Sequence, residues 1–222
     1  MSRILVKVGG AVSADAAEEI VALADAGHEV VVVHGAGPQI TYELTRRGIE
    51  ARFVRGRRVT TPEVLEVVRE SLDGVNAEVC AAIGPTALPL RGEDVGLRAR
   101  QVPSLGLVGE PEPCAPGAVL DAVAAGRVPV VSPLAVGPLN VNADEAAAAL
   151  AVGLGAARIL FVSDVPGVVV EGALARVLPA DEAEAALDAG AFEGGIVPKL
   201  LAAVRAARGG VQASIGVTEV PA

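Results

Sequence analysis

Residues 29–40 read EVVVVHGAGPQI and combine a strand, a glycine-rich turn and the start of a helix. The run Glu29–Val33 is almost entirely valine, which is typical of a strand buried on both faces of a parallel sheet. A helix is expected from about Pro38 to Arg47, with Gly48 just past its end. The turn His34-Gly35-Ala36-Gly37 therefore joins a strand to a helix N-terminus, where backbone N–H groups can face an anion.

The same alternation of short apolar strands and helical patterns extends along the chain. Further strands are expected at Ile4–Val8, Ala87–Leu90, Val128–Val131 and Arg158–Val162. Further helices are expected at Ala14–Ala26, from Thr60-Thr61-Pro62-Glu63 to about Ile83, at Asp144–Leu154 and at Pro198–Arg208. This order predicts an α/β fold, a three-layer αβα sandwich with a mainly parallel central sheet.

Local signals support two of the helix starts, and one segment departs from the alternation. Ser13 can cap the helix that follows it. The segment Thr60–Glu63 offers a Thr cap, a Pro in the first turn and Glu63 as a capping-box partner. Gln101–Pro116 is rich in Pro and Gly, so an irregular or hairpin region is expected there.

The length of 222 residues suits one domain that spans residues 1–222. A soft boundary near Pro133–Leu139 predicts two lobes within this domain. Residues 1–135 and residues 136–222 are then each expected to hold one of two ligands.

Composition argues against several classes of function. The formal net charge is -9, whereas a nucleic-acid or anionic-membrane surface needs a basic face. The two cysteines, Cys80 and Cys114, form no C-x-x-C pair, so neither a disulfide framework nor a zinc site is expected and a reducing cytoplasm fits. The apolar run at the N-terminus is too short for a signal peptide, and no stretch has the length of a membrane span.

Lysine is unusually rare in this chain. Of 18 Lys and Arg residues, only Lys7 and Lys199 are lysines. Lys7 precedes Gly9-Gly10, and Lys199 follows Gly194-Gly195 at the expected start of a helix. A compact ammonium beside a glycine-rich turn suits a transferring phosphoryl group, although two ordinary surface lysines would give the same count.

Two polar segments are candidates for binding a substrate. Arg55-Gly56-Arg57-Arg58 holds three arginines in four positions, which is either a solvated loop or a site where one guanidinium binds a carboxylate. Asn140, Asn142 and Asp144 precede an alanine-rich helix, and a helix cap would explain only one of these three side chains.

Ser163-Asp164-Val165-Pro166-Gly167 follows an expected strand, at the end of a parallel sheet where ligands bind. Neither a Walker motif nor a Rossmann fingerprint is present in the chain. His34 is interpreted as a structural residue at a strand end, not as a general base.

Taken in order, these motifs resemble the amino acid kinase family, and most closely its members that phosphorylate N-acetyl-L-glutamate. The resemblance covers nearly the whole chain. It rests on KVGG at Lys7–Gly10, VVVHGAGPQI at Val31–Ile40, FVRGRRVTTPEVLEVV at Phe53–Val68, LNVNADEAAAALA at Leu139–Ala151, SDVPGV at Ser163–Val168 and GGIVPKLLAAV at Gly194–Val204.

The resemblance implies a role for each matching residue. Lys7 and Lys199 would stabilise the transferring phosphoryl group, and Asp144 would hold both lysines. The expected substrate-binding residues are Gly35, Ala36, Gly37, Arg58, Asn140 and Asn142. The expected nucleotide-binding residues are Gly9, Gly10, Ser163, Asp164, Val165, Gly167 and Phe192. No side chain is expected to be a metal ligand.

The reaction that the resemblance implies is transfer of the terminal phosphoryl group of Mg-ATP to the side-chain carboxylate of N-acetyl-L-glutamate, in arginine biosynthesis. A free glutamate side chain titrates near ~4.3, so the nucleophile is already ionised and needs no general base. The product would be an acyl phosphate.

The chain departs from the family pattern at four places, one of which is the loop after Gly167, which looks shortened. Ala36 interrupts the usual glycine triplet, and its methyl group is expected to restrict the turn. The family's chains continue beyond the segment Thr218–Ala222, so the nucleotide lobe is expected to be shortened. The extension that accompanies arginine-inhibited hexamers is not seen before the first strand, so a homodimer without that regulation is expected.

Two alternatives remain open at this point. The chain could be a kinase for aminoadipate or glutamate bound to a carrier protein, in lysine or arginine biosynthesis. It could also be a family member that binds ligand without catalysis. An acidic carrier would require a basic entrance, which the net charge of -9 does not favour.

Overall fold

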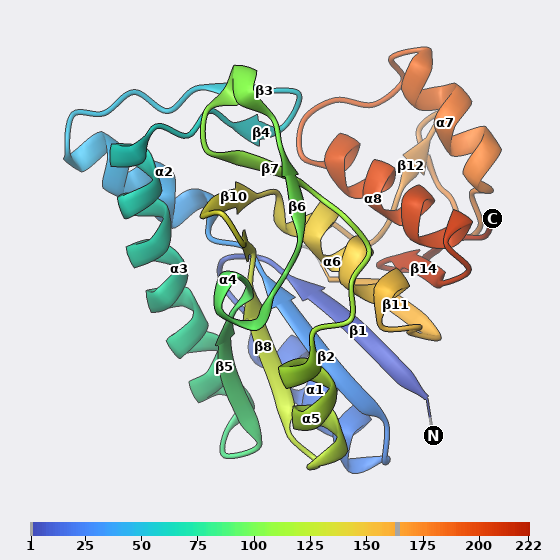
Figure 1. Cartoon of the computed structure of the whole chain (residues 1–222). Helices are drawn as coiled ribbons and strands as arrows, with labels where there is room; N and C mark the ends of the chain where they lie inside the picture. Colours follow the sequence, from blue (N-terminus) through green and yellow to red (C-terminus); the bar gives the residue numbers. More distant parts are fainter. Residues whose placement is uncertain (1, 163–164) are drawn as a thin grey trace.

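The valine runs form the centre of one large sheet. The computed structural model describes residues 2–162 and 165–222, and in that part of the chain the sheet has seven strands in the order β15-β14-β11-β1-β2-β8-β5 (Figure 1). All neighbouring strands are parallel except β14 and β15. The strands are β1 (Arg3–Val8), β2 (Glu29–His34), β5 (Ala87–Arg91), β8 (Val128–Ser132), β11 (Arg158–Phe161), β14 (Gln212–Ile215) and β15 (Thr218–Val220).

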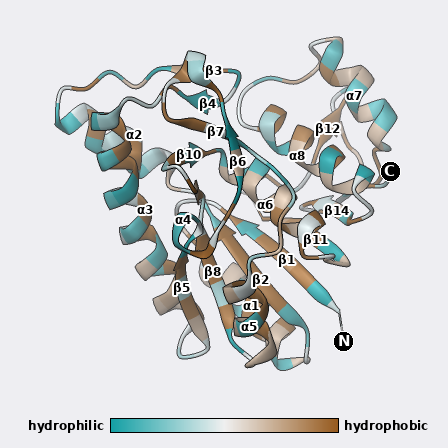
Figure 2. Cartoon of the chain, in the orientation of Figure 1, coloured by the Kyte–Doolittle hydropathy of each residue, from teal (hydrophilic) through white to brown (hydrophobic). Residues whose placement is uncertain are grey.

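Alternate residues of the central strands enter two separate hydrophobic cores. Ile4, Val6 and Val8 of β1 pack with the first core, whereas Leu5 packs with the second. The first core is closed by α1 (Ala14–Asp25), α2 (Gly37–Arg46) and α3 (Pro62–Ile83). The second is closed by α5 (Gly117–Ala124), α6 (Ala143–Gly153), α7 (Ala180–Asp188) and α8 (Ile196–Arg208). Figure 2 shows hydrophobic residues along the central strands, and the three-layer αβα sandwich is confirmed.

Smaller sheets lie at the end of the main sheet where β1 and β2 finish (Figure 1). A four-stranded sheet has the order β6-β7-β10-β9, and its antiparallel β6–β7 hairpin begins two residues before the segment Gln101–Pro116, where an irregular or hairpin region was predicted. Two-stranded hairpins are formed by β3 with β4 and by β12 with β13. Their bounds are β3 (Phe53–Val54), β4 (Arg57–Arg58), β6 (Ala99–Gln101), β7 (Val108–Pro111), β9 (Leu134–Ala135), β10 (Leu139–Val141), β12 (Val169–Val170) and β13 (Ala173–Leu174), with the short helices α4 (Gly92–Val95) and η1 (Pro103–Leu105).

Capping side chains set the helix starts, with one correction. Ser13 accepts a hydrogen bond from the backbone N–H of Ala16, as predicted. Thr61 caps α3 by accepting from the N–H of Val64. Glu63 is therefore the second residue of the helix and not the third, so its predicted role in a capping box is wrong. Helix α8 begins at Ile196, two residues before the predicted start.

The main sheet draws strands from both predicted lobes, and the division between residues 135 and 136 stays a prediction. Within residues 2–162 and 165–222, no helix has the length and apolar character that crossing a membrane requires.

Candidate active site

Three charged side chains from distant parts of the chain meet beside the end of β1. The ammonium nitrogen of Lys7 lies 2.8 Å from Asp144 Oδ1, and that of Lys199 lies 3.2 Å from the same oxygen. Lys7 belongs to β1, Asp144 to the first turn of α6 and Lys199 to the first turn of α8. The fold therefore brings together the three residues that the sequence singled out as catalytic, and their catalytic role stays a prediction.

This lysine–aspartate cluster carries an excess of positive charge in a buried place. Its three side chains are only 9–11% exposed, so water screens their charges poorly. Burial lowers the pKa of Lys199, the charge of Lys7 lowers it further, and Asp144 opposes both effects. One carboxylate facing two ammonium groups leaves a site that an anionic ligand would complete.

Two cavities flank the lysine–aspartate cluster. The smaller has a volume of about 290 Å³ and extends toward β4 and β10. The larger has a volume of about 900 Å³ and extends toward α8. Both are lined by Lys7, Gly9, Gly10, Pro38 and Asp144. A group held in one cavity can therefore meet a group held in the other at the cluster.

The turn at Gly35, Ala36 and Gly37 lines the smaller cavity. The N–H of Gly35 donates to the carbonyl of Val8 and extends the main sheet, so it is not available to a ligand. In the part of the chain that the structure describes, the N–H groups of Ala36 and Gly37 have no hydrogen-bond partner. Ala36 has a φ of -146°, which side chains tolerate, and its methyl packs in the first core. The alanine therefore forces no strained angle on this turn.

Arg58 is a buried cation on the wall of the smaller cavity. The residue is 7% exposed, and its Nη2 donates to the carbonyl of Gly37 (3.1 Å) and to Thr41 Oγ1 (2.9 Å). Its Nη1 is buried and has no partner among the described residues. Burial lowers the pKa of Arg58, and the ring of Phe53 lies 4.5 Å from its guanidinium carbon. The guanidinium therefore places a positive charge beside the cavity, where a carboxylate could pair with it.

The two asparagines have different tasks. Asn140 lines the smaller cavity and donates to Thr60 Oγ1 at 2.9 Å. Asn142 is the N-cap of α6, because its Oδ1 accepts from the N–H groups of Asp144 and Glu145. A helix cap therefore explains Asn142, although its side chain also lines the cavity. The part that each asparagine plays in binding a substrate stays a prediction.

The larger cavity contains part of the predicted nucleotide set. Gly9, Gly10 and Val165 line it. A methyl group on Gly10 would lie 2.3 Å from Gln39 Oε1, and Gln39 donates to the carbonyl of Gly10 at 2.6 Å. Glycine at position 10 thus lets Gln39 cover the turn.

The other predicted nucleotide residues either do not line the larger cavity or fall outside the described residues. Gly167 packs under Thr218, since an added Cβ would lie 2.6 Å from Thr218 Oγ1. Phe192 packs against the second core, next to Glu193, which lines the larger cavity. Ser163 and Asp164 lie outside the described residues. The nucleotide-binding roles of all four residues stay predictions.

Sequence reasoning missed several residues of the cavity walls. Glu193 and Ile196 line the larger cavity on either side of Gly195. The glycine pair before Lys199 was the signal that could have identified them. Phe53, on the wall of the smaller cavity, was quoted only as part of a motif.

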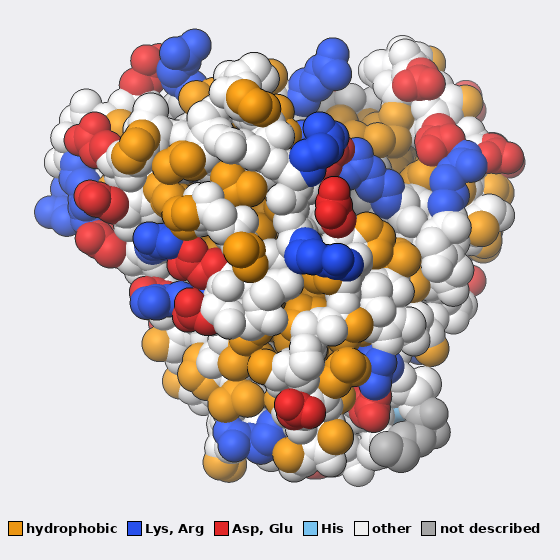
Figure 3. Space-filling view, viewed as in Figure 1, with side chains coloured by type: hydrophobic (Ala, Val, Ile, Leu, Met, Phe, Trp, Pro, Cys, Tyr) orange, Lys and Arg blue, Asp and Glu red, His pale blue; other side chains and the backbone are white. Residues whose placement is uncertain are grey.

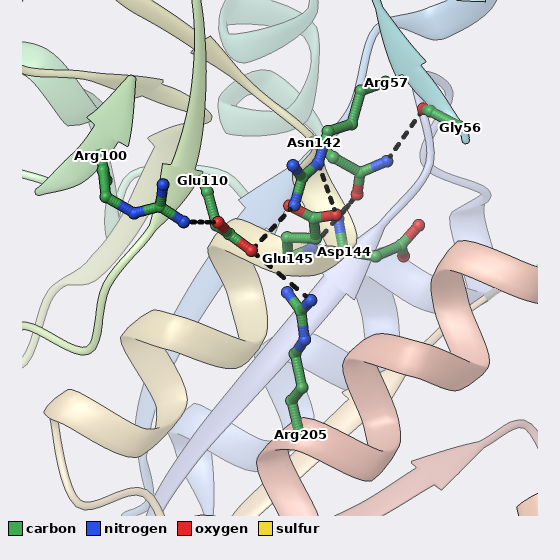
Figure 4. Close-up of polar contacts among 8 residues, drawn as sticks. All are labelled: Gly56, Arg57, Arg100, Glu110, Asn142, Asp144, Glu145 and Arg205. Atoms are coloured by element: carbon green, nitrogen blue, oxygen red, sulfur yellow. Dashed lines mark hydrogen bonds and ion pairs between the residues drawn. The ribbon is translucent and has the colours of Figure 1, made fainter. Parts of the chain in front are cut away.

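An ion-pair network beside the smaller cavity was also missed (Figure 4). Arg57 donates to both carboxylate oxygens of Glu145, at 3.1 and 3.0 Å, and lies 3.3 Å from Glu110. Glu110 also pairs with Arg100 and, at 3.7 Å, with Arg205. Burial lowers the pKa of Arg57, but the bonds and charges of Glu145 and then Glu110 leave that pKa raised.

His34 is a fully buried residue at the end of β2. Its Nε2 lies 3.0 Å from the side-chain nitrogen of Asn76, which donates to it, and its Nδ1 lies 3.3 Å from the carbonyl of Gly35. Burial lowers the pKa of His34 to about 4, so the ring is neutral at pH 7. This geometry agrees with the structural role that the sequence predicted.

The charged side chains on the face shown in Figure 3 are of mixed sign. Lys and Arg lie among Asp and Glu, with hydrophobic side chains between them. This face therefore offers no continuous basic surface to a polyanion.

Comparison with known proteins identifies the family. The model of the amino acid kinase family matches residues 2–216. The acetylglutamate kinase of Saccharopolyspora erythraea is 44% identical, over 94% of this chain and 77% of the relative, and that of Salinispora tropica is 42% identical, over 96% and 81%. The crystal structure of smu.665 from Streptococcus mutans UA159 has the same fold, with a TM-score of 0.90, 24% identity and coverage of 99% of this chain and 98% of that one. The chain belongs to the amino acid kinase family.

Proposed function

We propose that this chain transfers the γ-phosphoryl group of ATP to the side-chain carboxylate of N-acetyl-L-glutamate, as a step of arginine biosynthesis. The observation that carries the proposal is the pair of cavities that share Lys7 and Asp144, with Lys199 on the wall of the larger one. The name of its relatives at 42–44% identity, acetylglutamate kinase, supports the choice of acceptor.

The smaller cavity suits the acceptor. Its volume of about 290 Å³ fits a small dicarboxylate better than a nucleotide. The guanidinium of Arg58, on the wall of this cavity, would bind one carboxylate, and the N–H groups of Ala36 and Gly37, which line the same cavity, would donate to a second anionic group. The larger cavity, of about 900 Å³, has room for ATP.

The chemistry needs positioning and charge neutralisation from the protein. The acceptor carboxylate is ionised at neutral pH, because its pKa is ordinarily ~4.3. Two anions must therefore approach each other, and the ammonium groups of Lys7 and Lys199 would offset that repulsion. Asp144 keeps the two ammonium groups together, since each lies within 3.2 Å of one of its oxygens.

The proposed Mg²⁺ would be bound mainly by ATP. Among residues 2–162 and 165–222, no group of three His, Cys, Asp or Glu side chains could hold a metal ion. Mg²⁺ commonly binds phosphate oxygens and water with few protein ligands. The ion would neutralise phosphate charge, while the chain's own lysines hold the transferred group.

We also propose a homodimer in the cytoplasm. The free thiols of Cys80 and Cys114 are compatible with a reducing compartment. Light scattering after size-exclusion chromatography would distinguish a dimer from a monomer or a larger ring.

The test is ATP turnover with Mg²⁺ and free N-acetyl-L-glutamate, in which hydroxylamine traps the acyl phosphate. We expect a hydroxamate signal that depends on both substrates. A folded protein that yields no hydroxamate would refute the proposal. The same assay with a carrier-bound acceptor would then test the carrier alternative, and loss of both signals would favour a chain that binds without catalysis.

A further inference from the structure

Arg57 and Arg58 are neighbours in β4 but have different surroundings. Both line the smaller cavity. Arg58 keeps a buried donor without a partner among the described residues, whereas Arg57 is engaged with Glu145 and Glu110. Arg57 is therefore poorly placed to bind the acceptor, and its two-pronged contact must serve another purpose.

The contact of Arg57 joins the β3–β4 hairpin to the helix that carries Asp144. Glu145 follows Asp144 in the first turn of α6. The side chains of Arg57 and Glu145 are 16% and 11% exposed, so solvent screens the pair only in part. Asn142 adds a second link, because its amide donates to the carbonyl of Gly56 at 3.4 Å (Figure 4).

The same hairpin also contacts the helix that carries Lys199. A Cβ on Gly56 would lie 3.4 Å from the side chain of Pro198, so the turn packs directly against the residue before Lys199. Glu110 lies between Arg57 and Arg205 of α8, at 3.3 and 3.7 Å. Three elements that carry Arg58, Asp144 and Lys199 are thus tied together at one point.

We infer that Arg57 is a positioning residue whose ion pair with Glu145 fixes Arg58 relative to the lysine–aspartate cluster. The inference rests on the proposed function for the identity of the acceptor. A hairpin without this ion pair would sample other positions, and Arg58 would bind the acceptor carboxylate less often in the productive place. Acceptor affinity then falls more than the rate of transfer at saturation.

The kinetic test is a double-mutant cycle with Arg57→Gln and Glu145→Gln. We expect each single variant to raise the KM for N-acetyl-L-glutamate about tenfold and to change kcat less than about threefold. The KM of the double variant should equal that of each single variant, because the same interaction is lost in all three proteins. Arg57→Lys keeps the positive charge but loses the two-pronged contact of the guanidinium, so its KM for the acceptor should lie between those of wild type and Arg57→Gln.

The control is Arg100→Gln. Arg100 shares Glu110 with Arg57, but its side chain is 68% exposed and lies outside the hairpin and α6. This variant should leave the KM for the acceptor unchanged. Three results would each overturn the inference. The first is an equal rise in the KM of Arg100→Gln, the second is a double variant whose KM effect is the product of the single effects, and the third is a fall in the kcat of Arg57→Gln with no change in its KM.

Amide hydrogen exchange tests the same link without catalysis. In the protein alone, Arg57→Gln should speed exchange in residues 53–58 by about tenfold, and Arg100→Gln should not. Unchanged exchange in Arg57→Gln would overturn the inference. If wild-type protein gives no hydroxamate, the proposed function fails, and hydrogen exchange still decides whether Arg57 holds the hairpin.

Discussion

Acidification should destabilise the fold through His34. The unfolded chain binds a proton on this ring below pH 6.5, whereas burial lowers the folded-state pKa to about 4. Between these values the unfolded state holds more protons, so stability falls as the pH drops from 6.5 to about 4 and this effect levels off below. The difference between the two pKa values corresponds to about 3 kcal/mol of folding stability, at ~1.4 kcal/mol per pH unit.

The assay is urea denaturation of wild type and His34→Gln from about pH 7 to about pH 4.5. Carboxylates also contribute to acid destabilisation, so the informative quantity is the difference between the two proteins as the pH changes. We expect wild type to lose about 2–3 kcal/mol more than the variant over this range. The comparison holds even if His34→Gln is less stable at pH 7, because only the pH dependence matters.

A matched control is His28→Gln, since this other histidine is only partly buried and bonds to Ser2 near the chain start. This variant measures how far replacing a histidine elsewhere in the chain alters the dependence on pH. Parallel loss of stability in wild type and His34→Gln would refute the reasoning, because it would mean that His34 does not resist protonation in the folded state.

Three further predictions follow from the site and the cores. Lys7→Arg and Lys199→Arg should each lower kcat about 10²–10³-fold in the hydroxamate assay, because a wide guanidinium cannot replace a compact ammonium at 2.8–3.2 Å from Asp144; near-normal turnover would contradict their assignment. Asp144→Asn should destabilise the fold by about 3–5 kcal/mol in urea denaturation, because it leaves two buried ammonium groups without their counter-charge, and an unchanged stability would show that the cluster is not ionised as described. Gly153→Ala should destabilise the protein by about 1–3 kcal/mol, because its Cβ would lie 2.2 Å from the backbone of Cys114. Gly74→Ala should stabilise α3 by about 0.5–1 kcal/mol, because its Cβ would meet nothing within 4 Å. Thermal unfolding that finds Gly153→Ala more stable than Gly74→Ala would refute both expectations.

Much of the main sheet and its helices could be predicted from the sequence. The valine run of β2 and the strands β1, β5, β8 and β11 were found to within one residue at either end. Helix ends were equally clear where a cap or a glycine marked them, as at Ser13. These signals are local, because hydrophobic period and capping depend on residues within a few positions of each other.

The short elements were not predicted, for a physical reason. Strands such as β9 and β12 have two residues, which is too few to show any alternation. The three-residue strand β10 also depends on a distant partner, because it pairs with β7, which precedes α5 and β8 in the chain. The antiparallel end of the main sheet, where the four-residue β14 pairs with the three-residue β15, was also missed.

By itself, the sequence determined the layers of the fold and, through the order of its motifs, the residues to examine as a site. The resemblance implied that Asp144 holds Lys7 and Lys199, and the tertiary structure decided that both ammonium groups reach the same oxygen. Only the tertiary structure decided that two N–H groups of the glycine turn have no partner among the described residues, and that Arg57 bonds to a residue 88 positions away. Contacts of this kind depend on how packed helices and strands bring distant segments together. They leave no periodic or local mark in the sequence, because the free energy that forms them comes from the fold as a whole.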